Sequence, residues 1–248
     1  MKFYMLASGS KGNAFVLDTH DQKILIDCGT TRRYLNEAFE QIGYDKDMFD
    51  NILITHNHSD HISQIRMFKD HPNVYSPEAL VINHTLVQPY VALNFGSVRV
   101  LPLATSHDAD VSVGYVIEAS GKKLVYMTDT GYVRDSDLEY MMDADLIVIE
   151  SNHDPHLLMN TKRPYMTKQR ILSDYGHLSN DEAGRVLSKI VSDRTQDVIL
   201  AHLSGEANNE ALALETVSKY LNGYKGRLRA ARQFEIISGE LSIKGVSD

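Results

Sequence analysis

The chain has 248 residues, of which 43% are apolar and 23% are charged, and its net charge is −8. This length allows one large domain or two small ones, and because the sequence has no low-complexity linker or apparent boundary we predict one domain over residues 1–248. The net charge argues against a protein that coats nucleic acid through overall positive charge. The single cysteine, Cys28, excludes an internal disulfide framework, and no apolar run has membrane-spanning length. Because the apolar start Met1–Ala7 is too short for a signal-peptide core, we expect a cytoplasmic protein without a membrane partner.

The first third of the chain alternates short strands with turns. Runs rich in apolar and β-branched residues predict strands at Lys2–Ala7, Ala14–Asp18 and Lys23–Asp27. The glycine-rich residues 8–13 precede a strand and open no helix, so they predict a tight turn facing the site, in preference to a phosphate-binding loop. Apolar residues recur at helical spacing from Tyr34 to Ile42, which predicts a helix that ends near Gly43.

The next stretch places four potential metal ligands within six residues, directly after the apolar run Ile52–Ile54. The ligands are His56, His58, Asp60 and His61. The run predicts a buried strand, and the loop leaving the carboxyl end of such a strand usually carries the chemistry of an α/β sheet. Imidazole and carboxylate groups at this spacing suit two adjacent cations, whereas the alternative is an ordinary polar loop rich in histidine. We expect a helix over Ile62–Lys69 and a strand over Val74–Ser76 to follow.

Four more polar groups follow expected strands. Strands over Val98–Ala104, Lys122–Met127, Asp145–Ile149 and Asp197–Ala201 lead to His107, Asp129, Glu150 and His202. Val113–Ala119 is expected to form a hairpin with the second of these strands. Ser179–Glu182 has the form of a capping box that opens a helix. A further helix over Asn209–Leu221 and two strands, Phe234–Ser238 and Leu241–Lys244, complete the expected elements.

The segment His56-Asn57-His58-Ser59-Asp60-His61, followed by His107, Asp129 and His202, resembles the metallo-β-lactamase superfamily over nearly the whole chain. The resemblance implies an α/β fold, a four-layer αβ/βα sandwich with a dinuclear metal site at one edge of its sheets. It implies that His56, His58 and His107 hold one metal, that Asp60, His61 and His202 hold the other, and that Asp129 bridges them. It also implies that Asp27 is a carboxylate that steadies the metal loop from behind.

Within the superfamily, four segments resemble the YycJ-type branch of cytoplasmic metallohydrolases associated with DNA exonuclease activity. They are 6–13, 150–154, 170–180 and 200–204. Glu150 and His177 also resemble the pair in ribonuclease Z in which a glutamate steadies a histidine that protonates the departing oxygen. The segment Glu78–Phe95 matches no family motif.

Two divalent cations, two carboxylates and one bridging hydroxide would leave a charge of about +1, which suits an anionic phosphodiester. We therefore predict a dinuclear phosphodiester hydrolase, with a DNA exonuclease favoured, in which Asp60, His177 and Glu150 are catalytic. Zinc is the favoured metal, with manganese or iron as alternatives. The alternative functions are a small-molecule phosphodiesterase, a hydrolase of carbonyl esters or thioesters and, last, a regulatory module without catalysis.

Two basic stretches are candidates for a nucleic-acid contact. The first contains Lys162, Arg163, Lys168 and Arg170, beside Tyr165, and the second contains Lys225, Arg227, Arg229 and Arg232. We expect the first to bind substrate phosphates; the alternative is that both are solvated faces of an acidic protein. The remaining histidines match no ligand position and are expected to be ordinary solvated side chains; they are His20, His71, His84, His153 and His156. Cys28 is expected to be a small buried residue.

Overall fold

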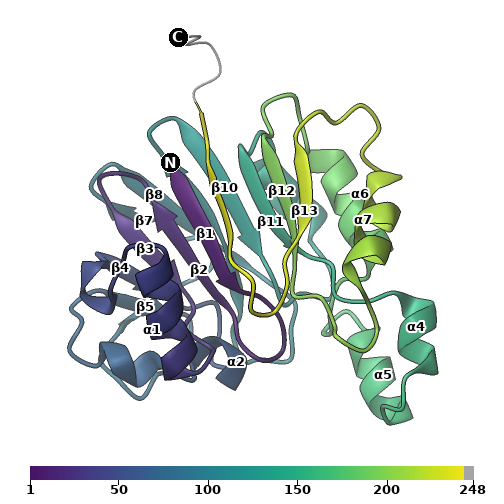
Figure 1. Cartoon of the computed structure of the whole chain (residues 1–248), viewed down its shortest axis with the longest axis horizontal. Helices are drawn as coiled ribbons and strands as arrows, with labels where there is room; N and C mark the ends of the chain where they lie inside the picture. Colours follow the sequence, from purple (N-terminus) through teal and green to yellow (C-terminus); the bar gives the residue numbers. More distant parts are fainter. Residues whose placement is uncertain (243–248) are drawn as a thin grey trace.

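A computed structural model describes residues 1–242 and contains two seven-stranded β-sheets with helices on their outer faces (Figure 1). The first sheet has the order β14-β1-β2-β3-β4-β5-β6. Its strands are β1 (Lys2–Ala7), β2 (Ala14–Asp18), β3 (Lys23–Ile26), β4 (Asn51–Leu53), β5 (Val74–Ser76), β6 (Thr85–Leu86) and β14 (Ile237–Glu240). The second sheet has the order β13-β12-β11-β10-β9-β8-β7. Its strands are β7 (Leu93–Phe95), β8 (Val98–Ala104), β9 (Val113–Ala119), β10 (Lys122–Met127), β11 (Leu146–Glu150), β12 (Asp197–Ala201) and β13 (Arg227–Ala230).

The helices are short and lie between strands. They are α1 (Arg32–Gln41), α2 (Ser59–Ile62), α3 (Leu138–Met141), α4 (Pro155–Asn160), α5 (Tyr165–Ile171), α6 (Asn180–Ile190) and α7 (Glu210–Ser218). Three short 3-10 helices cover Lys46–Met48, Ile65–Phe68 and Asp135–Asp137. Across residues 1–242, none of the helices has the length and apolar character needed to cross a bilayer.

Three layers of buried side chains hold the sheets and helices together. Phe15 of the first sheet packs against Tyr126 of the second, in a core that both sheets share. Leu35 and Phe39 of α1 lie in a core on the outer face of the first sheet, and Leu187 of α6 lies in one on the outer face of the second. The order helix, sheet, sheet, helix confirms the predicted four-layer sandwich.

The parallel part of the second sheet explains why distant residues meet. The strands β10, β11, β12 and β13 run parallel, in that order. The carboxyl ends of parallel neighbours lie at one edge of a sheet, so Asp129, Glu150 and His202 leave adjacent strands at the same edge.

Three predicted helices are confirmed, one of them from its capping box and one from its apolar periodicity. Thr31 caps α1 by accepting a hydrogen bond from the backbone N–H of Tyr34, and Ser179 and Glu182 form the predicted capping box of α6. The helix predicted over Asn209–Leu221 is confirmed but shorter, because Asn209 is the N-cap of α7 and the helix ends at Ser218.

The helix predicted over Ile62–Lys69 is wrong. Helix α2 begins earlier, at Ser59, and a separate 3-10 helix covers Ile65–Phe68. Backbone groups on both sides of this break bond to Cys28: the His61 carbonyl accepts from the Cys28 N–H at 2.7 Å, and the Gln64 N–H donates to the Cys28 carbonyl at 3.0 Å. These long-range bonds replace helical ones, which ends α2.

The C-terminal strands also differ from the prediction. The chain forms β13 at Arg227–Ala230, parallel to β12, and β14 at Ile237–Glu240, antiparallel to β1. The predicted strand Phe234–Ser238 is therefore displaced. Of the predicted strand Leu241–Lys244, residues 241 and 242 are not in a strand, and the rest lies outside the described residues.

Candidate metal centre

The loop after β4 and three other strand ends bring all seven predicted ligands to one edge of the sandwich. The ligand atoms of His56, His58 and His107 lie within 4.8 Å of one another, and those of Asp60, His61 and His202 do the same. Asp129 forms a third such group with His56 and His61. The geometry thus reproduces the two sets that the resemblance implies, with Asp129 near both.

Two buried ring nitrogens in this cluster suggest what it holds. Within residues 1–242, the Nε2 atoms of His56 and His202 are buried and have no hydrogen-bond partner. Buried polar atoms in folded proteins are nearly always satisfied, so unpaired imidazole nitrogens facing carboxylates fit a bound cation. Nitrogen and oxygen donors without thiolate suit zinc, manganese or iron.

Partners outside the cluster fix how three imidazoles point. Asp27 accepts a hydrogen bond from Nδ1 of His61 at 2.7 Å, and Gly176 accepts one through its carbonyl oxygen from Nδ1 of His107 at 3.2 Å. Glu150 accepts one from Nδ1 of His202 at 2.9 Å. Each bond leaves Nε2 of the ring directed into the cluster, which is the usual arrangement of a metal-binding histidine.

The glycine-rich turn at residues 8–13 supports the metal loop, which confirms its predicted position. The backbone N–H of Asn13 donates to the Asp60 carbonyl oxygen at 2.8 Å, and Nδ2 of Asn13 lies 3.0 Å from Nε2 of His61. Gly29 packs under the same loop so closely that a Cβ atom there would lie 1.6 Å from the Asp60 carbonyl oxygen. The metal loop therefore packs directly against the backbone at Asn13 and Gly29.

Two residues of the cluster, and Asp27 behind it, have a left-handed backbone that non-glycine residues rarely adopt. The φ angles are 61° at Asp27, 53° at Asp129 and 55° at His202. Such conformations cost of order 1–3 kcal/mol each and persist where the surrounding structure enforces them, most often at functional sites. At Asp27 and His202 the turn also ends a strand, which places the side chain at the sheet edge.

Burial and charge divide the imidazoles into two types. Burial lowers the pKa of His56 well below its usual value and also lowers that of His107, so both rings are neutral. Burial also opposes charge on His61, but the carboxylates of Asp27 and Asp129 outweigh it and raise its pKa to about 10. Metal binding requires the loss of such protons, so protons and cations compete for this cluster.

Glu150 and His177 form the predicted pair. Oε1 of Glu150 accepts hydrogen bonds from Nδ1 of His177 at 2.8 Å and from Nδ1 of His202. Its Oε2 accepts from the backbone N–H groups of Thr130 at 3.0 Å and Leu178 at 3.2 Å. Burial disfavours the carboxylate, but His177 and His202 outweigh burial and lower its pKa to about 2. With four donors on its two oxygens, Glu150 has no free lone pair for a metal and acts as an anchor for histidines.

A cavity of about 390 Å³ opens over this cluster. Its lining includes His58, Asp60 and His177, and two of the four residues predicted to bind substrate, Arg163 and Arg170.

The four basic residues of the first stretch differ in their partners and in whether they line the cavity. Arg163 pairs with Glu206 at 3.0 Å, and Arg170 pairs with Asp108. Lys162 and Lys168 do not line the cavity. The ammonium group of Lys168 donates to the carbonyl oxygens of Met159 and Thr161 at 2.7 Å each, at the end of α4.

The residues of the second basic stretch do not line the metal cavity. Arg227 and Arg229 both pair with Asp197, and Arg232 pairs with Glu210 and Glu235. These arginines form ion pairs with carboxylates of the chain itself.

A family model described as the beta-lactamase superfamily domain matches residues 22–203. The chain belongs to the metallo-β-lactamase superfamily. It is 33% identical over 235 residues to a protein of Bacillus anthracis named exodeoxyribonuclease YycJ, with 89% of each chain covered. It is 34% identical over 236 residues to one of Streptococcus pneumoniae serotype 2 (strain D39) named exodeoxyribonuclease WalJ, covering 89% of this chain and 88% of the relative.

Solved structures share the fold of this chain. The metallo-β-lactamase fold protein YhfI of Bacillus subtilis aligns with a TM-score of 0.73 and 18% identity, covering 96% of this chain and 99% of that one. The short form of human tRNase Z aligns with a TM-score of 0.64 and 17% identity, covering 98% and 100%. The superfamily and the named relatives establish the chain as a metal-dependent hydrolase.

Sequence reasoning missed Glu78, which ties two ligand-bearing loops of this superfamily site together. Its Oε2 accepts from the backbone N–H of Asn57, in the metal loop, at 2.8 Å. Its Oε1 accepts from the N–H of Val111, four residues after His107, at 3.4 Å. The available signal was a glutamate two residues after the expected strand Val74–Ser76, but no local pattern shows that it is buried or which groups it bonds to.

His153 was predicted to be solvated, and this is wrong. Its side chain is buried, with 1% of its surface exposed, and neither ring nitrogen has a hydrogen-bond partner within residues 1–242. The cause is its place three residues after the end of β11, where it forms an isolated bridge with Ser179, the N-cap of α6. Burial lowers the pKa of this imidazole, so the ring is neutral.

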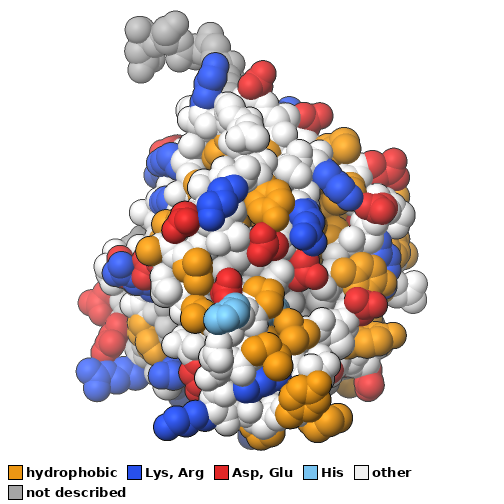
Figure 2. Space-filling model, turned by 90° about the vertical axis from the view of Figure 1, so that its right-hand side faces the viewer, with side chains coloured by type: hydrophobic (Ala, Val, Ile, Leu, Met, Phe, Trp, Pro, Cys, Tyr) orange, Lys and Arg blue, Asp and Glu red, His pale blue; other side chains and the backbone are white. Residues whose placement is uncertain are grey.

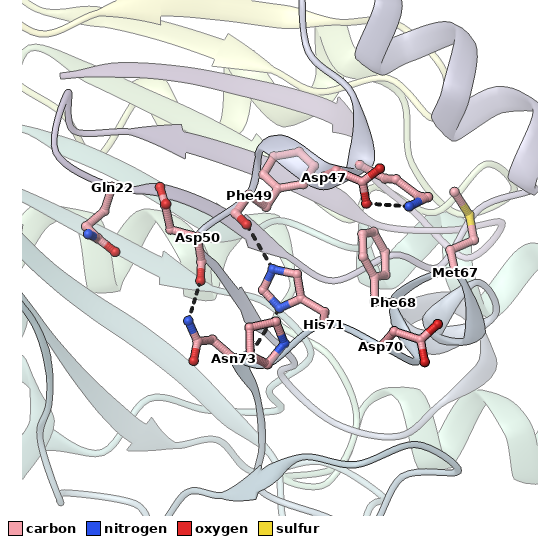
Figure 3. Close-up of a pocket in the computed structure, with 11 residues that line it drawn as sticks. Gln22, Asp47, Phe49, Asp50, Met67, Phe68, Asp70, His71 and Asn73 are labelled. Atoms are coloured by element: carbon pink, nitrogen blue, oxygen red, sulfur yellow. Dashed lines mark hydrogen bonds and ion pairs between the residues drawn. The ribbon is translucent and has the colours of Figure 1, made fainter.

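His71 is half-buried rather than fully solvated, and it lines a separate hollow of about 500 Å³ beside the start of β4 (Figure 3). The polar groups there are paired: Nε2 of His71 lies 2.8 Å from the Phe49 carbonyl oxygen, and Nδ2 of Asn73 donates to the Asp50 carbonyl oxygen at 2.9 Å. These internal bonds explain the hollow as a structural loop junction.

Proposed function

We propose that this hydrolase cleaves the phosphodiester bonds of a polynucleotide with two divalent metal ions, and that DNA cut from an end is the favoured substrate. The observation that carries the proposal is one cavity lined by five of the seven ligand positions, a carboxylate-anchored histidine and two arginines. The other two ligand positions, His56 and His61, are buried in the same cluster. The relatives named exodeoxyribonucleases support the choice of substrate.

In this proposal His56, His58 and His107 would hold one ion, Asp60, His61 and His202 would hold the other, and Asp129 would serve both. Zinc is favoured, with manganese or iron as alternatives, because the donors are nitrogen and oxygen. When bound, the ions would polarise the phosphoryl oxygens and lower the pKa of a water molecule so that it can attack at neutral pH.

His177 is proposed to supply the proton that the departing oxygen needs. Its Nδ1 is held by Glu150 at 2.8 Å, and the side chain, 13% exposed, lines the cavity. The buried carboxylate keeps a proton on Nδ1, so the proton available for transfer is the one on Nε2. Asp60, with 24% of its side chain exposed, lines the same cavity and is proposed to orient the attacking water as well as to bind metal.

Arg163 and Arg170 are proposed to bind the phosphates that flank the cleaved bond. Each pairs with one carboxylate in the structure, but a guanidinium group has five N–H donors and can bind an additional anion. Lys162, on the same segment, is exposed and is proposed to add a weaker, salt-sensitive contact. Lys168 is proposed to act mainly through the helix end that it holds.

The test is to give the metal-loaded protein end-labelled single- and double-stranded DNA, RNA and a small chromogenic phosphodiester, with His58→Ala as the inactive control. We expect shortening of DNA from an end. Arg163→Ala and Arg170→Ala should weaken polynucleotide cleavage and flatten its salt dependence while sparing the small diester. Cleavage of the small diester alone, insensitive to salt and to both changes, would assign a small-molecule phosphodiesterase. Cleavage only of a carbonyl ester or thioester would assign the other alternative.

A further inference from the structure

The helices α4 and α5 stand out from the body of the molecule (Figure 1). Arg163 and Arg170 of this segment line the metal cavity. A small core of Leu158, Ile171 and Ala207 attaches them. Their surface is unusually apolar: Tyr165 is 64% exposed, Met166 is 76% exposed and, just after α5, Tyr175 is 66% exposed. Figure 2 shows hydrophobic side chains gathered with Lys and Arg side chains on the lower part of this face.

The residues of this apolar surface lie close in sequence to residues that line the metal cavity. Arg163, which lines the cavity, lies two residues before Tyr165, and two residues span at most about 7 Å. Met166 lies four residues before Arg170, another lining residue, so the two are neighbours on one face of α5. Tyr175 is two residues before His177, which also lines the cavity.

The charge of the same segment matches a polyanion. Residues 155–178 contain four Lys or Arg side chains and one Asp, on a chain whose net charge is −8. Exposed aromatic rings beside a basic groove are the combination with which proteins bind single-stranded nucleic acid, because every base offers a face for stacking.

We propose that Tyr165, Met166 and Tyr175 form a platform on which unpaired bases next to the cleaved phosphate stack. This inference rests on the proposed function and specifies its substrate as a strand whose terminal bases are unpaired, whether in a single strand or at an opened duplex end. Stacking recognises no particular base, so the platform predicts tolerance of sequence. In this arrangement the platform binds the bases by stacking, whereas Arg163 and Arg170 bind the phosphates.

The experiment compares kcat/KM on a single-stranded oligonucleotide with kcat/KM on the same strand carrying abasic sites at its three terminal positions. On the intact strand, Tyr165→Ala and Tyr175→Ala should each lower kcat/KM by roughly 5- to 150-fold, the usual range for one lost base stack. On the abasic strand and on a small chromogenic diester the same changes should have no effect. Tyr165→Phe should retain activity, because the ring is kept.

Tyr140→Ala is the matched control, since Tyr140 is an exposed tyrosine on α3 that does not line the cavity. An equal effect of the Tyr165 and Tyr175 changes on intact and abasic strands would overturn the platform. So would a change of oligomeric state in Tyr165→Ala or Met166→Ala measured by light scattering, which would assign the surface to a second copy of the chain. If the unchanged protein cleaves no polynucleotide at all, the proposed function fails first.

Discussion

Asp27→Asn is expected to weaken metal binding by reversing a hydrogen bond that orients His61. In the structure, Oδ1 of Asp27 accepts from the Thr55 N–H at 2.9 Å, and Oδ2 accepts from both the Thr55 hydroxyl and Nδ1 of His61. If Asn keeps its oxygen toward the backbone N–H, its NH₂ group replaces Oδ2. His61 can then accept that hydrogen only with its own proton on Nε2, the nitrogen that faces the metals. Asn tolerates the φ of 61° at this position, so the backbone should be retained.

Loss of such an outer partner usually costs 10- to 100-fold in metal affinity, and the reversed tautomer places the expected loss near the upper end, roughly 100-fold. The assay is competition with a chelator of known affinity, monitored by metal release. Asp145→Asn is the matched control, because Asp145 is also buried but bonds to Lys122 and Arg194, away from the metal centre. Metal affinity in Asp27→Asn equal to that of the control, with the fold retained, would refute the reasoning.

Three more changes test other parts of the account. His177→Ala should keep its metals and lose roughly 10²–10⁴-fold in rate on substrates with basic leaving groups, but little on an activated phenolate, and equal losses on both would contradict the assigned role. Glu78→Gln turns one acceptor into a donor against two loop N–H groups, so chelator competition should show roughly tenfold weaker metal binding; an unchanged affinity would make Glu78 dispensable. For Asp145, burial raises the pKa but bonds led by Lys122 outweigh it, and the pKa lies below 3.8. The carboxylate therefore stabilises the fold above that pH, and denaturation should show that Asp145→Asn is about 3–5 kcal/mol less stable than the unchanged protein. This difference in the free energy of unfolding should be constant from pH 7 to pH 5 and should decrease only as the pH falls below 3.8. A decrease in this stability difference between pH 7 and pH 5 would contradict a lowered pKa of Asp145.

The meeting of the polar strand-end residues could be predicted because it depends on local patterns. Apolar runs fix where β4, β10, β11 and β12 end, and parallel pairing brings three of those ends to one edge. Polar residues such as Asp129 and His202 directly after the runs therefore had to meet. The capping box at Ser179 is equally local, since both of its bonds lie within one helical turn.

The features that sequence patterns missed depend on partners far along the chain. The break after α2 arises from backbone bonds to Cys28, and the burial of His153 arises from its pairing with Ser179. Glu78 acts on loops 21 and 33 residues away. The ion pairs of Arg227 and Arg229 with Asp197 depend on the register between β12 and β13, which composition alone does not encode.

Metal content per chain tests the central claim most directly. The measurement is elemental analysis of protein purified without chelators, together with Asp60→Ala and His202→Ala. The two ligand groups that meet around Asp129 predict close to two divalent ions per chain, and at least one fewer in each variant. One ion per chain in the unchanged protein, or two ions retained in both variants, would contradict the dinuclear centre.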